Sequence, residues 1–484
     1  MSGERAIRSI AVAGAGVVGL SAALAFARAL PSAGITIIKS TPDPAALADT
    51  LPVAQAAGAR LHALLGLDEE ELVRAGIATH FLGTRFEDWS ASGAPWWHVQ
   101  GSYGKPAGAI PFDQIWARAH AAGKAQPYDR YAVGAALARV GKFVHPAADP
   151  NFVGSRFAYG LRLDPELYLE ALRKQAETAN VAFQEGDIER VELRSDGGVS
   201  GLRLSGGSRV EADLFVDCTG PSASVISAVD DSFEDWGNWL PFDRLSLGFA
   251  VGPDVPLPAD RVRATPDGWV AEWPLRGRTM TGRLSRHAGI SGDEDGIALT
   301  RGRRSRPWVR NVLALGDAAT AMDPLHRLNL DMAHHLILLA LELLPGRDFH
   351  PAETGEYNRR AEQVTRRVRD FLSVHYLRSG RSDGTWRDFA AAAPADSLAR
   401  TFDQYEYRGR LPFHEDESVS RDSWTAVLLG LGVMPSELDP AAAAVSLDEA
   451  LMAMEQLARE IEDIVQKLPS YAEYLGGMSA VPRR

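Results

Sequence analysis

The sequence predicts an α/β fold that opens with a dinucleotide-binding βαβ unit. An apolar strand at residues 10–13 is followed at once by a glycine-rich turn and an alanine-rich helix over residues 20–30. A second apolar strand, at residues 312–316, runs into an aspartate. The chain beyond residue 349 is mostly helical. Strands that alternate with helices in this way are typical of α/β proteins.

The glycine-rich turn contains Gly14, Gly16 and Gly19. Gly14 permits a tight turn, Gly16 lets the backbone approach a pyrophosphate, and Gly19 lets helix and strand pack closely. The helix then presents free N–H groups and a positive dipole end to phosphate. A following strand at residues 35–38 completes the unit, although a phosphate-free turn is the alternative. The predicted phosphate-binding residues are Gly14, Ala15, Gly16, Val18 and Gly19.

Lys39 lies at the end of the second strand, where an acidic residue usually holds the ribose hydroxyls. A lysine cannot accept a hydrogen bond, so Lys39 either pairs with a phosphate or lies in solvent. Gly316 and Asp317 end the later strand and resemble the second FAD signature of flavin hydroxylases. That resemblance implies that Asp317 meets the ribityl chain. A long helix from Asp317 through Leu344 is expected to point its N-terminus at the flavin ring.

Composition excludes several classes of protein. The 484 residues are 45% hydrophobic and 24% charged, with a formal net charge of -12, which favours a soluble protein without a nucleic-acid partner. The one cysteine, Cys218, allows no intrachain disulfide. We find no signal peptide, and the apolar stretch at 336–344 is too short to span a bilayer. We therefore predict a cytoplasmic protein with no membrane association.

Several motifs follow one another along the chain. After the glycine turn come Gly83-Thr84-Arg85-Phe86-Glu87-Asp88-Trp89, Ala212 to Gly220, Gly268-Trp269 to Pro274, Met322-Asp323-Pro324-Leu325, and Leu468-Pro469-Ser470-Tyr471-Ala472-Glu473-Tyr474. In order and spacing they resemble the flavin-dependent tryptophan halogenase family, and the chain is identified as a divergent member. The resemblance implies FAD, reduced by a separate flavin reductase, and a small-molecule substrate. The resemblance also suggests that the protein forms a homodimer.

The resemblance implies an FAD/NAD(P)-binding Rossmann-like flavoprotein monooxygenase fold with a substrate-side β-sheet and a helical C-terminal region. We expect a discontinuous FAD-binding module over residues 1–345, with substrate-side insertions at about 60–155 and 225–300. A mostly helical region over residues 346–484 would complete the substrate side. Residues 95–152 are rich in Gly, Pro and aromatics and are expected to be irregular.

The residues that halogenate in this family are replaced. Family members pass hypohalous acid to a lysine, and a glutamate assists its attack on an aromatic carbon. The lysine position here is Phe81, which can neither form a haloamine nor donate a hydrogen bond. The glutamate position is His326, and the halide loop reads Leu328-Asn329. The flavin strap, Gly-Glu-[Ser/Ala]-Thr-x-Pro in the family, reads Leu47-Ala48-Asp49-Thr50-Leu51-Pro52.

His326, Arg327 and Asp331 are our catalytic candidates. Asp331 shares a helix face with His334 and His335, at spacings of three and four residues. A capped helix start with buried histidines explains this spacing first, and acid/base chemistry or metal binding are the alternatives. We assign no metal site. Pro324, Leu328 and Asn329 join the cofactor-binding candidates, and the predicted substrate pocket, which packing alone would also explain, contains His80, Phe81, Trp97, Trp269 and Trp424.

Three functions remain open. The first is a flavin-dependent oxidation or hydroxylation of an aromatic or other small substrate, which needs reduced flavin and a dry pocket but no lysine. The second is a catalytically degenerate protein that binds flavin or a partner without turnover. The third is an atypical halogenase in which His80 or His326 substitutes for the family residues.

Overall fold

The computed structural model describes residues 6–286, 296–412 and 414–480. The chain forms two compact units, each assembled from three segments. The first unit comprises Met1–Ala78, Arg162–Gly237 and Ile297–Arg366. The second comprises Thr79–Leu161, Asn238–Gly296 and Arg367–Arg484. Three elements run through a boundary between these segments: β4 (Ala78–Phe81), β7 (Gly160–Leu163) and α9 (Pro351–Leu377).

A six-stranded sheet forms the centre of the first unit, in the order β20-β21-β12-β1-β2-β8. β1 pairs in parallel with both β2 and β12, which confirms the predicted βαβ unit. The inner strands are apolar runs because a parallel sheet is covered on both faces. The strands are β1 (Ser9–Ala13), β2 (Gly34–Lys39), β8 (Ala182–Glu185), β12 (Leu214–Asp217), β20 (Trp308–Val309) and β21 (Val312–Ala314).

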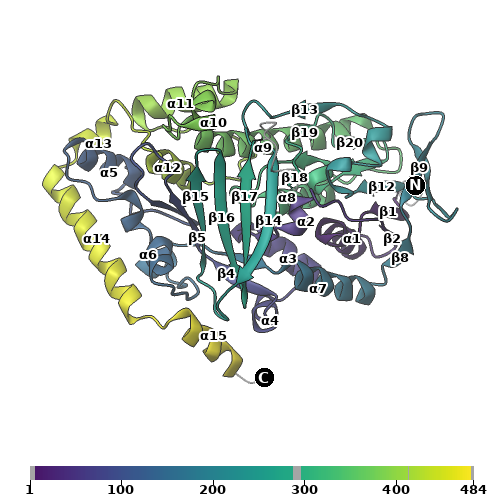
Figure 1. The fold of residues 1–484 in the computed structure, drawn as a ribbon, viewed down its shortest axis with the longest axis horizontal. Helices are drawn as coiled ribbons and strands as arrows, with labels where there is room; N and C mark the ends of the chain where they lie inside the picture. The colour runs from purple at the N-terminus through teal and green to yellow at the C-terminus, as the bar shows by residue number, and fades with distance from the viewer. Residues whose placement is uncertain (1–5, 287–295, 413, 481–484) are drawn as a thin grey trace. The chain divides into compact units, whose positions relative to one another are not determined.

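Helices cover this sheet, and α1 packs against both α7 and α8 (Figure 1). α7 begins where the side chain of Asp164 accepts a hydrogen bond from the N–H of Leu167 and Pro165 takes the first helical position. The helices are α1 (Val17–Ala29), α2 (Leu47–Thr50), α3 (Ala59–Leu65), α4 (Glu69–Arg74), α7 (Pro165–Thr178) and α8 (Asn329–Glu342). The short strands are β3 (Val53–Ala54), β9 (Ile188–Leu193), β10 (Val199–Leu204), β11 (Arg209–Val210), β13 (Phe233–Asp235), β18 (Ile297–Ala298), β19 (Gly302–Arg304) and β22 (Thr320–Ala321).

The second unit contains a largely antiparallel sheet in the order β14-β17-β16-β15-β5-β6. Its strands are β5 (Gly83–Glu87), β6 (Trp96–Val99), β14 (Arg244–Val251), β15 (Ala259–Thr265), β16 (Gly268–Leu275) and β17 (Arg278–Ser285). The long helix α14 packs against α5 and α6 (Figure 1). The helices are α5 (Phe112–Ala121), α6 (Val133–Arg139), α10 (Gly384–Ala390), α11 (Asp396–Arg408), α12 (Arg421–Gly430), α13 (Pro440–Ala444), α14 (Leu447–Lys467) and α15 (Tyr471–Ala480).

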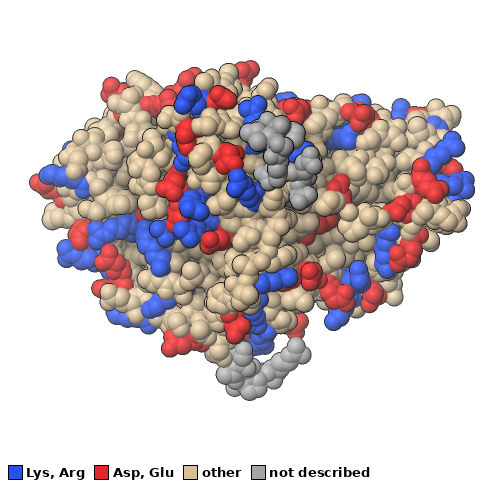
Figure 2. All heavy atoms as spheres, viewed as in Figure 1, with Lys and Arg blue, Asp and Glu red and all other residues tan. Residues whose placement is uncertain are grey.

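Charges of both signs are interspersed on the face that Figure 2 shows. On the sheet of the second unit, Arg261 pairs with Glu87 at 2.7 Å and Arg283 with Asp267 at 2.5 Å. Each exposed pair of this kind contributes at most about 1 kcal/mol of stability. Among the described residues, every helix is too short or too polar to cross a membrane.

Two sequence-based expectations are wrong. No long helix follows Asp317 directly, because a 3-10 turn (η6, Gly316–Ala318), β22 and a loop precede α8, which runs only to Glu342. Residues 95–152 are not irregular throughout, since they contain β6, α5 and α6.

Candidate functional site

The glycine turn of the first unit joins β1 to α1, and its three glycines meet different neighbours. Gly14 has φ +100°, and a Cβ on it would collide with the carbonyl oxygen of Cys218. A Cβ on Gly19 would collide with the carbonyl oxygen of Gly14. Backbone packing is therefore by itself enough to require glycine at these two positions. At Gly16, by contrast, the nearest atoms to a Cβ would all belong to the side chain of Asp49.

Asp49, on α2, caps the N-terminus of α1. Its Oδ1 accepts a hydrogen bond from the N–H of Val18 at 2.9 Å. Gly16, the N-cap residue, has no side chain for this role, and the first turn of α1 has no acidic residue. Burial raises the pKa of Asp49 to about 6, although the hydrogen bonds from Val18 and Val17 oppose that rise. Ala15 and Val18, both predicted cofactor residues, belong to this turn.

Asp317 follows Gly316, which takes a left-handed conformation with φ +60°. Its Oδ2 accepts a hydrogen bond from the N–H of Ala48 at 2.8 Å, and its Oδ1 accepts one from Asn329 at 3.1 Å. Burial raises the pKa of Asp317 to about 7, and the nearby charge of Asp49 adds to the rise. Two predicted cofactor residues, Asp317 and Asn329, are thus brought together.

The segment before α8 holds the remaining candidates of the first unit. Pro324, His326 and Arg327 are buried. Arg327 has φ +50°, a conformation that is uncommon outside glycine and that often occurs at functional sites. The side chain of Gln55 donates to the carbonyl oxygen of His326 at 3.3 Å. Leu328 is the N-cap residue of α8. This loop therefore fixes a histidine and an arginine next to a helix N-terminus.

Asp331, His334 and His335 lie on α8, with Asp331 and His335 half-buried and His334 buried. In the described part of the chain the ring nitrogens of His334 have no hydrogen-bond partner, and its ring lies edge-on to His62. Nε2 of His62 lies 2.9 Å from the hydroxyl of Tyr168. Burial lowers the pKa of His62 to about 4 and raises that of Asp331 to about 6. At neutral pH, burial therefore keeps His62 uncharged, whereas Asp331 is still mostly ionised but takes up a proton more easily than an ordinary aspartate.

Lys39, at the end of β2, pairs with Glu185 at 2.8 Å and lies over the ring of Phe183. Both contacts join neighbouring strands at the sheet surface. Lys39 thus has local partners without any phosphate, which favours the interpretation of a solvated strand end over that of a cofactor contact.

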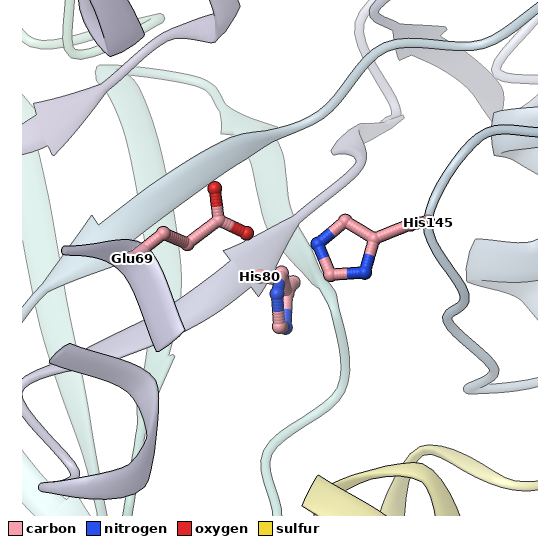
Figure 3. Close-up of side chains that lie close together, drawn as sticks. All are labelled: Glu69, His80 and His145. Carbon is pink, nitrogen blue, oxygen red and sulfur yellow. The ribbon is translucent and has the colours of Figure 1, made fainter. Parts of the chain in front are cut away.

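In the second unit, His80 lies within a cluster of aromatic side chains. Its ring stacks on Phe143 with centroids 3.8 Å apart, and the hydroxyl of Tyr471 lies 2.9 Å from its Nδ1. Figure 3 shows His80 with His145, whose Nδ1 lies 2.7 Å from the hydroxyl of Tyr474. The third residue drawn, Glu69, belongs to the first unit. Two imidazoles with ring centroids 5.6 Å apart could offer nitrogen ligands to a metal ion.

The other predicted pocket residues of the second unit belong to several elements, and Phe81 directly follows His80 on β4. Trp269 is buried, and its Nε1 lies 3.3 Å from the hydroxyl of Tyr376. Trp424 is buried against Phe371 and under the guanidinium of Arg367. Trp97 is half-buried on β6, and Phe81 is 5% exposed at the end of β4. For Trp269 and Trp424, core packing accounts for the contacts seen.

Sequence reasoning missed two features of these sites. It treated Asp49 only as a departure from the strap, because the acidic cap comes from a helix that lies 31 residues away along the chain. It also missed His145 and the role of Tyr471, which lie 65 and 391 residues from His80 along the chain. The motif from Leu468 to Tyr474 was the one available signal for the second feature.

Comparison with known proteins identifies the family. The family model described as Tryptophan halogenase matches residues 9–447. Tryptophan 7-halogenase RebH of Lentzea aerocolonigenes is 26% identical over 544 residues, covering 98% of this chain and 99% of that protein. BrvH, a flavin-dependent halogenase from Brevundimonas sp. BAL3, has a TM-score of 0.90 and 32% identity, covering 98% and 99% of the two chains. Xcc4156, a flavin-dependent halogenase from Xanthomonas campestris, has a TM-score of 0.89 and 28% identity, covering 99% and 100%.

These matches confirm the α/β, FAD-binding Rossmann-like fold. The cofactor of this family is FAD, supplied in reduced form by a separate flavin reductase. The first unit fits this cofactor, because Gly16 has no side chain to cover the N–H groups at the N-terminus of α1. The opening that Gly16 leaves there is filled by the carboxylate of Asp49.

Proposed function

Because the chain belongs to the tryptophan halogenase family, we propose that it uses reduced FAD and oxygen to oxidise or hydroxylate an aromatic or other small organic substrate without halogenating it. One observation carries this proposal: the lysine position of the family is Phe81, 5% exposed. A phenyl ring has no nitrogen to take up halogen and no hydrogen-bond donor for an oxidant.

The residues of the first unit have separate tasks in this proposal. The turn from Gly14 to Gly19 holds the pyrophosphate with the N–H groups of α1. Asp317 and Asn329, which are hydrogen-bonded to each other, hold the ribityl hydroxyls. When bound, reduced flavin supplies the two electrons that convert oxygen and a C–H bond to a hydroxyl group and water.

Proton transfer falls to the candidates around α8. Asp331 has a pKa raised to about 6, close to the range in which a carboxylate is an effective general base. Arg327, held in a left-handed conformation, supplies a fixed positive charge. His326 takes the place of the family glutamate and can accept a proton that a glutamate would otherwise receive. These roles are proposals for the three residues.

A second candidate function is a degenerate flavin-binding protein without turnover. The cap that Asp49 places on α1 favours it, because a carboxylate competes with phosphate for the same N–H groups. An atypical halogenase would need His80 or His326 to replace the family residues. For all three functions we propose a cytoplasmic location, a flavin reductase as partner and a homodimer as the assembly to test.

The test is a reductase-coupled assay with NADH, FAD, labelled ¹⁸O₂ and a panel of indoles and phenols, run with and without bromide. We expect products that have gained one labelled oxygen, in equal amount in both conditions. Products that carry bromine would contradict the proposal and restore the halogenase assignment. Flavin oxidation without any altered substrate would favour the degenerate protein.

A further inference from the structure

The first turn of α1 already has an anionic partner, the carboxylate of Asp49. The N–H of Val18 donates to it at 2.9 Å, and the N–H of Val17 also hydrogen-bonds with it. These are among the free N–H groups that the start of a helix offers to phosphate. The same carboxylate is also the nearest group to the place where a Gly16 side chain would project. The opening that Gly16 creates therefore faces Asp49.

We propose that Asp49 is a built-in competitor of FAD: its carboxylate occupies the pyrophosphate position of the glycine turn, and the cofactor binds only when residues 43–52 carry that carboxylate away. The inference rests on the proposed function in taking FAD as the ligand. It adds that the chain itself sets the affinity, through one residue of the flavin strap.

Steric exclusion and charge both prevent carboxylate and phosphate from sharing this position. The carboxylate atoms of Asp49 would lie within van der Waals distance of any single carbon attached to Gly16. Asp317 adds a second carboxylate, whose pKa is raised further by the charges of Asp49 and Asp43. An ionised pyrophosphate entering beside these groups would meet like charges at short range in a partly buried site, where screening by solvent is weak.

Asp49 is held by hydrogen bonds and by the packing of a short helix. α2 has only four residues. On the side that faces the site, the strap is tied by the bonds from Val17 and Val18 to Asp49 and by the bond from Ala48 to Asp317, and Leu47 and Leu51 are buried. Opening the strap breaks these contacts, and this cost adds to the penalty that Asp49 sets against FAD binding. The family has a neutral Ser or Ala where this chain has Asp49, so the competing charge is a property of this chain.

The experiment measures binding of oxidised FAD by equilibrium dialysis at pH 7 to the full chain and to three variants. Asp49→Ser removes the carboxylate, and we expect it to lower the Kd for FAD at least tenfold. Asp49→Asn keeps an acceptor oxygen without the charge, and we expect an intermediate effect of about threefold. Asp149→Asn is the matched control, because Asp149 is exposed in the second unit and accepts a hydrogen bond from the N–H two residues later, as Asp43 does. We expect its Kd to stay within twofold of the parent value.

ADP is the second probe, since it carries the pyrophosphate without the flavin. Asp49→Ser should lower the Kd for ADP by the same factor as the Kd for FAD. An equal change for both ligands locates the effect at the phosphates that they share. Equal or weaker binding of both ligands by Asp49→Ser, with the parent chain still binding FAD, would overturn the inference and leave the proposed function intact. A different result would overturn both the inference and the proposed function. In that result FAD binds neither to the parent chain nor to any variant that keeps the parent's melting temperature.

Discussion

The glycine turn and the positions that halogenate in relatives have diverged by different amounts. Gly14 and Gly19 are fixed by backbone contacts that no other residue permits. Phe81 and His326 are buried, a condition that other side chains of suitable size also satisfy. A scaffold can therefore lose its chemistry without losing its fold, because packing constrains the turn far more tightly than it constrains the reactive side chains.

The strongest way to break this comparison is to block the turn on its ligand side. We expect Gly16→Val to weaken FAD binding at least about 100-fold, or ~2.7 kcal/mol, because the new side chain fills the opening beside Asp49. Fluorescence titration of FAD measures the effect. Gly355→Ala is the control, since a Cβ there meets nothing within 4 Å. Unchanged affinity for FAD in Gly16→Val would mean that the turn has only a packing role and does not bind the cofactor.

Restoring the family lysine tests the other side of the comparison. Phe81→Lys places a cation in a position that is 5% exposed, and we expect a loss of about 3 kcal/mol in stability, seen as a lower melting temperature. Phe81→Leu, which keeps an apolar side chain, should lose about 1 kcal/mol. We expect neither variant to brominate indole. Bromination by Phe81→Lys would show that the remaining halogenation machinery is intact.

The buried histidine His62, which lies against His334 of α8, predicts how stability depends on pH. The pKa of His62 falls from 6.5 to about 4 on folding, so between these values the unfolded chain binds a proton that the folded chain does not. This contribution to stability is present above pH 6.5 and is lost as the pH falls towards 4. The loss is at most about 3 kcal/mol.

The variant His62→Gln removes this titration while keeping a partner for the hydroxyl of Tyr168. Urea unfolding at pH 6.5, 5.5 and 4.5 should therefore show a shallower fall in stability for the variant. Parallel curves for parent and variant would mean that His62 takes up its proton at the same pH in the folded and the unfolded chain.

The smallest effect is expected at Lys39. Because Lys39 pairs with Glu185 on a neighbouring strand, Lys39→Ala should change the Kd for FAD less than about twofold. Isothermal titration with FAD measures it, with Lys105→Ala as an exposed control. A tenfold loss would show that Lys39 releases Glu185 and contacts the cofactor.

The sequence was sufficient to predict the turn and the fold, because strand, glycine turn and helix are local patterns. It did not predict the cap on α1, since Asp49 reaches that helix only after the chain has folded back. It placed the helix after Asp317 too early, because the loop before α8 is as buried as a helix and its end is not marked by an exposed stretch. The cluster around His80 depends on Phe143, His145 and Tyr471, which no local spacing connects.

The visible spectrum of the purified chain, titrated with FAD under oxidised and reduced conditions, tests the central claim most directly. The claim is that the turn still holds FAD although the halogenating residues are gone. We predict a saturable change in the flavin absorption bands that Gly16→Val abolishes. Spectra identical to free flavin in both redox states would contradict the account and leave the glycine turn as a packing motif.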